Sequence, residues 1–194
     1  MNICVYGASS DAIDKRYIEA GELLGEEMAK RGHSLVYGGG AHGLMGAVAR
    51  GMTKGGGKIV GVAPSFFEVD GVLYEKCTEF IYTETMRERK QIMEESADAF
   101  IMTPGGIGTY EEFFEILTLK QLDRHPKAIA ILNTLGYFDP LEELMERTAD
   151  LNFMRHKSLE LYAIFSEPEA LLNYLENYKA KTYDINETKH IGRV

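Results

Sequence analysis

The sequence predicts an α/β fold, a Rossmann-like doubly wound parallel sheet in a single domain. Short apolar runs alternate with longer amphipathic stretches along the chain, a pattern typical of a parallel sheet with helices on both faces and right-handed crossovers. Glycine-rich segments directly follow several of the apolar runs, and in such folds ligands bind beyond the carboxyl ends of the strands. With 194 residues, 45% of them hydrophobic, the chain can bury one substantial core.

Six apolar runs are the expected strands. They span residues 3–6, 34–37, 59–63, 80–82, 99–102 and 128–132. Because no repeat, low-complexity block or linker divides the chain, we expect residues 1–181 to form one Rossmann-like domain. The polar residues 182–194 are the expected C-terminal tail.

Helical patterns fill the gaps between these runs. The first carries an apolar stripe at helical spacing, made of Tyr17, Ala20, Leu24 and Met28. Further helices are expected over residues 85–97, 138–151 and 167–181, and another runs from the glycine segment near residue 104 to residue 122. Asp139 and Pro140 are the expected cap and first residue of the 138–151 helix.

Charge and composition exclude several classes of partner. The net charge of -9 argues against general binding to nucleic acid or to anionic membranes, which requires basic surface. No apolar run approaches the roughly 18 residues of a membrane span, and no signal peptide pattern is present. Cys4 and Cys77 lie far apart without metal-ligand spacing, so we interpret both as buried structural thiols. These features favour a cytoplasmic protein.

The most informative segment is Pro104-Gly105-Gly106-Ile107-Gly108-Thr109-Tyr110-Glu111-Glu112, which follows an apolar run and opens a helical pattern. Glycines let a ligand approach the backbone closely, and a helix N-terminus offers unpaired N–H groups with partial positive charge. A phosphate or carboxylate is therefore the expected ligand. Carboxylates beside an anion site repel the ligand unless cations separate them, so the two glutamates indicate chemistry rather than simple phosphate binding.

Thr109 and Glu112 also have a purely structural interpretation, because Thr-x-x-Glu is the pattern of a capping box. In the alternative we favour, Glu112 is a catalytic carboxylate in the first helical turn, held in its charged form by the helix dipole. Glu111 and Glu112 point about 100° apart on a helix. Which of the two faces the substrate stays open at this stage.

A second glycine cluster, Gly38-Gly39-Gly40-Ala41-His42-Gly43-Leu44-Met45-Gly46, follows another predicted strand. A tight strand-to-helix turn is an equally good interpretation, and the cluster does not match the dinucleotide fingerprint. If it binds substrate, Gly39 and Gly40 are the expected contacts. Ser9, in the turn after the first strand, either binds phosphate or caps the following helix.

The basic counterpart is Met86-Arg87-Glu88-Arg89-Lys90. On a helix over residues 85–97, Arg89 and Lys90 lie at the two margins of the apolar stripe and face inward. The structural alternative is that Arg89 pairs with a structural carboxylate at the edge of the core.

These three motifs, in this order, resemble the Lonely Guy family of cytokinin-activating phosphoribohydrolases, over about residues 3–175. The resemblance implies a Rossmann-like fold, a homodimer, and hydrolysis of the N-glycosidic bond of nucleoside 5′-monophosphates to free base and ribose 5-phosphate. It matches Arg89 and Glu112 to the family's catalytic pair. Its nucleotide-binding positions correspond to Lys90, Gly105, Gly106, Ile107, Gly108, Thr109, Tyr110 and Glu111, with Glu68 and Thr118 as weaker matches.

Several points remain open at this level. The turn Gly7-Ala8-Ser9-Ser10 departs from the family's Cys-Gly-Ser-Ser, which leaves the base, adenine or prenylated adenine, undecided. No metal or cofactor is expected, since the five histidines show no ligand spacing and no constellation for pyridoxal phosphate accompanies the lysine decarboxylase label that relatives often carry. The alternative function is a non-catalytic nucleotide-binding or carrier module of the same fold.

Overall fold

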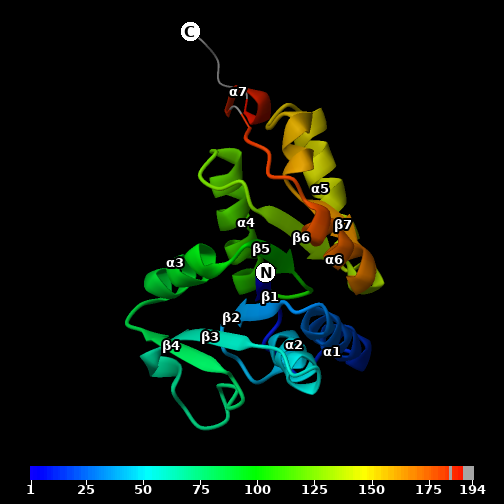
Figure 1. The fold of residues 1–194 in the computed structure, drawn as a ribbon. Coiled ribbons are helices and arrows are strands. Elements are labelled where there is room, and N and C mark those ends of the chain that lie inside the picture. Colours follow the sequence, from blue (N-terminus) through cyan, green and yellow to red (C-terminus); the bar gives the residue numbers. More distant parts are fainter. Residues whose placement is uncertain (184, 190–194) are drawn as a thin grey trace.

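The computed structural model describes residues 1–183 and 185–189, and within them it forms one seven-stranded parallel sheet (Figure 1). The strands are β1 (Asn2–Tyr6), β2 (Ser34–Tyr37), β3 (Ile59–Pro64), β4 (Glu79–Thr83), β5 (Ala99–Met102), β6 (Ala128–Leu132) and β7 (Ala163–Phe165). Their order across the sheet is β4-β3-β2-β1-β5-β6-β7. The six predicted strands are confirmed, and β7 is an addition.

The helices are α1 (Lys15–Lys30), α2 (Gly43–Lys54), α3 (Met86–Ser96), α4 (Ile107–Gln121), α5 (Asp139–Asp150), α6 (Pro168–Asn177) and α7 (Ile185–Thr188). Short 3₁₀ turns are η1 (Ser65–Phe67), η2 (Thr134–Gly136) and η3 (His156–Leu161). Two predicted boundaries were wrong. Phe138, rather than Asp139, caps α5, and α6 ends four residues before the expected residue 181 because Tyr178 adopts an extended backbone.

Each face of the sheet carries its own core. On one face, Tyr6, Phe100 and Ile129 pack against α3, α4 and α5 through side chains such as Met93 and Phe113. On the other face, alternate strand residues pack against α1, α2 and α6. Period-2 alternation along fully buried strands explains the division.

The two cysteines differ in burial. Cys4 is fully buried, and burial raises the pKa of its thiol to about 12. Cys77 is only half-buried, beside the Tyr37 hydroxyl at 3.8 Å, so the prediction that both thiols are buried was wrong for Cys77.

Helices α1 and α2 lie side by side (Figure 1) because glycines remove side chains where they meet. A Cβ at Gly51 would lie 2.0 Å from the Glu22 carbonyl oxygen, and a Cβ at Gly25 would lie 2.2 Å from that of Val48. This close contact brings α2 and the loop before it against α1.

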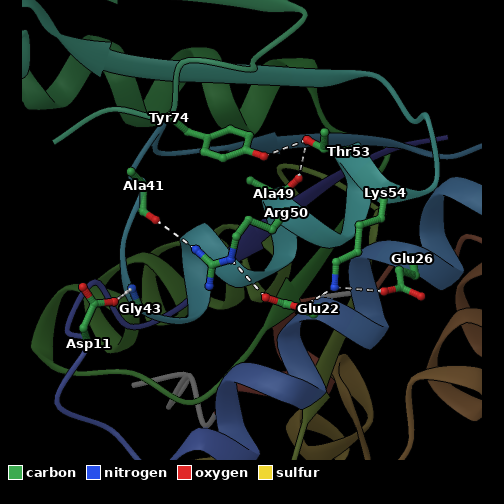
Figure 2. Close-up of polar contacts among 10 residues, drawn as sticks. All are labelled: Asp11, Glu22, Glu26, Ala41, Gly43, Ala49, Arg50, Thr53, Lys54 and Tyr74. Carbon is green, nitrogen blue, oxygen red and sulfur yellow. Dashed lines mark hydrogen bonds and ion pairs between the residues drawn. The ribbon is translucent and has the colours of Figure 1, made fainter. Parts of the chain in front are cut away.

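Arg50 connects this helix pair to the second glycine cluster. Its guanidinium donates to the Glu22 carboxylate at 3.0 Å and to the Ala41 carbonyl at 3.2 Å (Figure 2). Lys54 donates to the other oxygen of Glu22 at 2.5 Å. The turn after β2 is therefore held by charged side chains of α1 and α2.

The order of the strands reverses beside β1, which pairs with β2 on one side and β5 on the other. The loops that leave these strands are hydrogen-bonded to one another, since the Ala8 amide donates to the Pro104 carbonyl at 3.0 Å and the Met45 amide donates to the Ala8 carbonyl at 3.1 Å. Both glycine-rich segments consequently meet at the carboxyl edge of the sheet, where ligands bind in this class of fold.

Part of the predicted tail 182–194 packs on the domain. Tyr183 is buried, and its hydroxyl donates to the Glu160 carbonyl at 3.2 Å. Ser158 donates to the Thr188 carbonyl at 2.7 Å. Residues 184 and 190–194 of that predicted tail lie outside the described residues. Among the described residues, no helix combines the length and the apolar character needed to cross a bilayer.

Candidate active site

Helix α4 begins at Ile107, two residues earlier than Thr109, and Gly106 is its N-cap. No side chain of the described residues caps this end. Gly106, Ile107 and Gly108 are exposed, and a Cβ added at either glycine would meet no atom within 4 Å. The start of α4 is thus an open helix N-terminus whose first amide groups have no partner within the helix.

The capping-box interpretation of Thr109 and Glu112 was wrong. Thr109 is the third residue of α4 and is buried beneath the loop, where a Cβ on Gly105 would lie 2.1 Å from its Oγ1. The capping box lies instead on α3, where Thr85 Oγ1 accepts from the Glu88 amide at 3.1 Å and Glu88 accepts from the Thr85 amide at 3.2 Å. Glu88 therefore fixes the start of α3.

The residue after this box, Arg89, faces inward as predicted and is 8% exposed. Its Nη1 donates to Glu112 Oε1 at 2.8 Å, and its Nε donates to the carbonyl of Val62 in β3 at 3.2 Å. The Arg89 and Glu112 side chains are only 10% and 11% exposed. The predicted catalytic pair thus forms a direct, largely buried ion pair.

Sequence reasoning missed a requirement for this pair. A Cβ on Gly38 would lie 2.1 Å from Nη2 of Arg89, so only glycine leaves room for the guanidinium at that position. Gly38 stands in the glycine run noted in the sequence, but nothing in the run itself connects it to a residue 51 positions later.

Burial raises the pKa of Glu112 above its ordinary value, and the nearby Arg89 guanidinium opposes this effect. The prediction that the helix dipole holds Glu112 in its charged form was wrong, because Glu112 is the sixth residue of α4 and lies beyond the first turn. Arg89 is the group that supplies the counter-charge for an ionised Glu112.

Lys90 points to the other two carboxylates of this helix. Its Nζ lies 2.5 Å from Glu111 and 2.8 Å from Glu115, and these hydrogen bonds raise the pKa of Lys90. Glu111 is exposed, so the two adjacent glutamates diverge: Glu112 turns inward to Arg89 and Glu111 outward to Lys90.

The other predicted residues lie on α4 and on the loops after β1 and β2. Tyr110 is half-buried on α4, and Ser9 is exposed with its carbonyl carbon 2.7 Å from where a Cβ on Gly43 would stand. Gly39 has a φ of 74°, and a Cβ there would lie 2.6 Å from the Phe80 ring, while Gly40 bridges to Leu73. The positive φ and the Phe80 ring therefore account for Gly39 without a ligand, whereas a Cβ on Gly40 would meet only the end of the Met45 side chain, at 3.1 Å.

Two weaker matches lie in other cavities. Glu68 follows η1 and lines a cavity with Phe80 and Tyr82. Thr118 is exposed near the end of α4 and lines a cavity of about 410 Å³ that also includes Phe114 and Phe153. No hydrogen bond joins either residue to the Arg89–Glu112 pair among the contacts of the described residues.

Comparisons with known proteins agree with this geometry. The family model described as "Possible lysine decarboxylase" matches residues 45–175, which include the whole glycine segment 104–112, the last two residues of the second glycine cluster, and the whole of α3 and α4. Among curated proteins, the cytokinin riboside 5′-monophosphate phosphoribohydrolase LOG2 of Arabidopsis thaliana is 36% identical over 184 residues, covering 94% of this chain and 85% of its own length. The corresponding LOG enzyme of Oryza sativa subsp. japonica is 38% identical over 178 residues, covering 91% of this chain and 73% of its own.

Among solved structures, a molybdenum cofactor binding protein of the phototrophic bacterium Rippkaea orientalis has a TM-score of 0.68 at 23% identity, over 90% of this chain and 94% of its own. The molybdenum cofactor carrier protein of Chlamydomonas reinhardtii has a TM-score of 0.68 at 20% identity, over 90% and 94%. At these identities the likeness shows the fold alone. The sequence relatives, the family match and the three motifs that meet at one sheet edge place this chain in the Lonely Guy family of phosphoribohydrolases.

Proposed function

We propose that this protein hydrolyses the N-glycosidic bond of AMP or of a cytokinin nucleoside 5′-monophosphate, releasing the free base and ribose 5-phosphate. The observation that carries the proposal is the buried Arg89–Glu112 pair, 2.8 Å apart, beside an uncapped helix N-terminus. The names of the relatives LOG2 and LOG support the reaction and the substrate class.

In the proposed complex the 5′-phosphate binds at the start of α4. The amide groups of Gly106, Ile107 and Gly108 lie at the open end of the helix, where the dipole favours an anion. Gly105 lets the loop pass over Thr109 without a clash. Lys90 on α3 contacts Glu111 and Glu115 of α4 and adds a positive charge that offsets these two carboxylates.

Glu112 then acts at the sugar. Cleavage of a ribosyl–base bond gives the ribose oxocarbenium character, which a nearby carboxylate stabilises, and the same carboxylate can take a proton from the attacking water. The water oxygen forms the new bond to the anomeric carbon, and the leaving base takes the bonding electrons and a proton. Arg89 holds Glu112 in place with one fixed donor and leaves other donors of its guanidinium for the substrate.

The first test is to incubate the protein with AMP and with isopentenyladenosine monophosphate and to separate free base from ribose 5-phosphate by chromatography. Wild type should release both products, and Glu112→Gln should lose about 10²–10⁴-fold in turnover. The matched control is Glu95→Gln, the same substitution at an exposed residue of α3, which should leave the rate unchanged. The ratio of the two wild-type rates identifies the preferred base.

The same experiment separates an enzyme from a non-catalytic nucleotide-binding or carrier module. Glu112→Gln of an enzyme binds AMP but does not turn it over. If wild type binds AMP yet releases no base, and Glu112→Gln binds as well or better, the protein is a carrier and the hydrolase proposal is wrong.

We also propose that the protein is a homodimer in the cytoplasm. Phe153 is 81% exposed and Phe114 37% exposed, and both line the cavity that holds Thr118, an apolar surface of the kind that associates. The free thiols of Cys4 and Cys77 suit a reducing compartment. Light scattering tests the dimer, and Phe153→Asp should shift the mass toward the monomer.

A further inference from the structure

The turn after β6 places one tyrosine against the predicted phosphate loop. Within η2, Leu135 has φ 56° and Gly136 has φ 70°. Non-glycine residues are disfavoured in this left-handed region, so the surrounding contacts must hold the turn in place. Asn133 does so, since its side chain accepts from the Phe138 amide and donates to Asp139, each at 2.7 Å.

This turn directs Tyr137 at the backbone of the glycine loop. The Tyr137 hydroxyl donates to the Gly105 carbonyl at 2.7 Å, and it accepts a hydrogen bond from the Tyr110 hydroxyl at 3.4 Å. The Tyr137 ring contacts Tyr17 of α1 edge-on, with 6.0 Å between ring centres. Side chains from α1 and α4 therefore contact Tyr137, which itself bonds to one peptide group of the loop.

Holding the Gly105 carbonyl has a geometric consequence for the next amide. In a trans peptide the C=O and the following N–H point in opposite directions, and the chain has no cis peptide among its described residues. A carbonyl fixed toward Tyr137 therefore fixes the Gly106 N–H on the opposite side. Gly106 has open space around it, and as the N-cap of α4 it opens the row of amides that the proposed function assigns to phosphate.

A backbone hydrogen bond also joins this loop to the loop that follows β1. The Ala8 amide donates to the Pro104 carbonyl at 3.0 Å, one residue before Gly105. Glycine at positions 105 and 106 gives this segment more backbone freedom than any other residue would, so an unrestrained Gly105–Gly106 peptide can rotate. The Tyr137 hydroxyl removes that freedom.

We propose that Tyr137 is a positioning residue for phosphate binding: its hydroxyl fixes the Gly105–Gly106 peptide so that the amides at the start of α4 face the 5′-phosphate. This inference rests on the proposed function and adds a residue to it that lies outside the three sequence motifs. The hydrogen bond from Tyr110, and to a lesser extent burial, raise the pKa of Tyr137 to about 12. The hydroxyl therefore keeps its proton for donation at neutral pH.

The test is Tyr137→Phe, which removes the hydroxyl and keeps the ring against Tyr17. Loss of one neutral hydrogen bond corresponds to roughly 5–10-fold in an equilibrium constant. We expect KM for AMP and the inhibition constant of ribose 5-phosphate to rise by this factor, while kcat changes less than about twofold. The inhibition constant of free adenine, which has no phosphate, should stay the same.

The matched control is Tyr183→Phe. Tyr183 also donates to a backbone carbonyl, that of Glu160 at 3.2 Å, but it lies in the C-terminal segment beyond α6. This variant should leave both inhibition constants unchanged, and its melting temperature shows what loss of one such bond does to the fold.

A second measurement does not depend on turnover. Titration of ribose 5-phosphate into Glu112→Gln, with and without Tyr137→Phe, should show the same 5–10-fold weakening. Unchanged affinity in the double variant, or equal weakening of ribose 5-phosphate and adenine, would overturn the positioning role. Absence of base release by wild type, with ribose 5-phosphate binding still weakened by Tyr137→Phe, would overturn the proposed hydrolase and leave the positioning role in place.

Discussion

Replacing Lys120 by methionine should stabilise this protein at neutral pH. Lys120 is 1% exposed, and its ammonium makes no hydrogen bond with any of the described residues. It stands over the Tyr178 ring, 4.8 Å from the centre. An ammonium without acceptors in an apolar site is costly, whereas methionine has a similar unbranched stem without the charge.

The lowered pKa of Lys120 gives the size of the stability gain expected from Lys120→Met. Burial, and then the like charge of Lys181, lower this pKa from 10.5 to about 8. At about 1.4 kcal/mol for each pH unit, this corresponds to about 3 kcal/mol of lost stability, of which the Tyr178 ring offsets at most about 2 kcal/mol. The net gain expected from Lys120→Met is therefore about 1–3 kcal/mol.

The pH dependence has a definite sign. Between the folded pKa of about 8 and the unfolded 10.5, the unfolded chain binds more protons than the folded chain, so stability rises with pH across this window. The cost of Lys120 is fully present below about pH 8 and disappears as the pH passes 10.5. The advantage of Lys120→Met should shrink over the same window.

Urea unfolding at pH 7 and at pH 10, at one protein concentration, measures the stability gain and its pH dependence. Thermal unfolding at pH 7 gives the melting temperature. At pH 7 the melting temperature of Lys120→Met should exceed that of wild type by roughly 3–10 °C. Lys127→Met is the matched control, because Lys127 also lies over a ring, that of Phe100 at 5.7 Å, but donates to the Glu94 carbonyl at 2.7 Å. The control should lose about 1 kcal/mol. A Lys120→Met protein no more stable than wild type at pH 7, or equally favoured at both pH values, would refute the reasoning.

Three further predictions concern the ion pair and the helix contact. Gly38→Ala places a Cβ 2.1 Å from the Arg89 guanidinium, so kcat/KM for AMP should fall at least tenfold while the urea midpoint changes little; an active variant would show that the guanidinium can move freely. Because burial raises the pKa of Glu112 and the base must be ionised, kcat/KM should decline on the acid side with a midpoint above 4.5, and a midpoint at or below 4.5 contradicts this assignment. Gly51→Ala, whose Cβ would lie 2.0 Å from the Glu22 carbonyl, should destabilise by about 1–3 kcal/mol in urea unfolding, and an unchanged midpoint would mean that α1 and α2 separate without cost.

Sequence patterns predicted the parts of this fold that depend on neighbours along the chain. The six strands inferred from apolar runs are present; all but the edge strand β4 are largely buried, and buried parallel strands need continuous apolar residues. β7 was missed because it has only three residues, all half-buried, and an apolar run as short as Ala163-Ile164-Phe165 does not stand out as a strand. Thr109 was wrongly considered as a cap, and Glu112 wrongly placed in the first turn, because Gly106 caps α4.

In the site too, sequence patterns predicted what depends on neighbours along the chain and missed contacts that depend on the fold. Arg89 and Glu112 could be chosen from helical spacing and motif order, but their 2.8 Å contact depends on how α3 and α4 pack across the sheet. Gly38 and Tyr137 act through space on residues 51 and 32 positions away. Spacing along one chain carries no information on such approaches, so only the folded structure reveals them.

The Arg89 guanidinium joins two parts of the sheet that fold from different stretches of the chain. It bonds to the Val62 carbonyl in β3 on one side of β1, and to Glu112 on α4, which follows β5, on the other. A chain with only one of these halves formed therefore has no assembled site at all. During refolding, hydrolysis should return only when whichever half of the sheet forms later is in place. The time course of recovered activity therefore reports the last step of folding rather than the first.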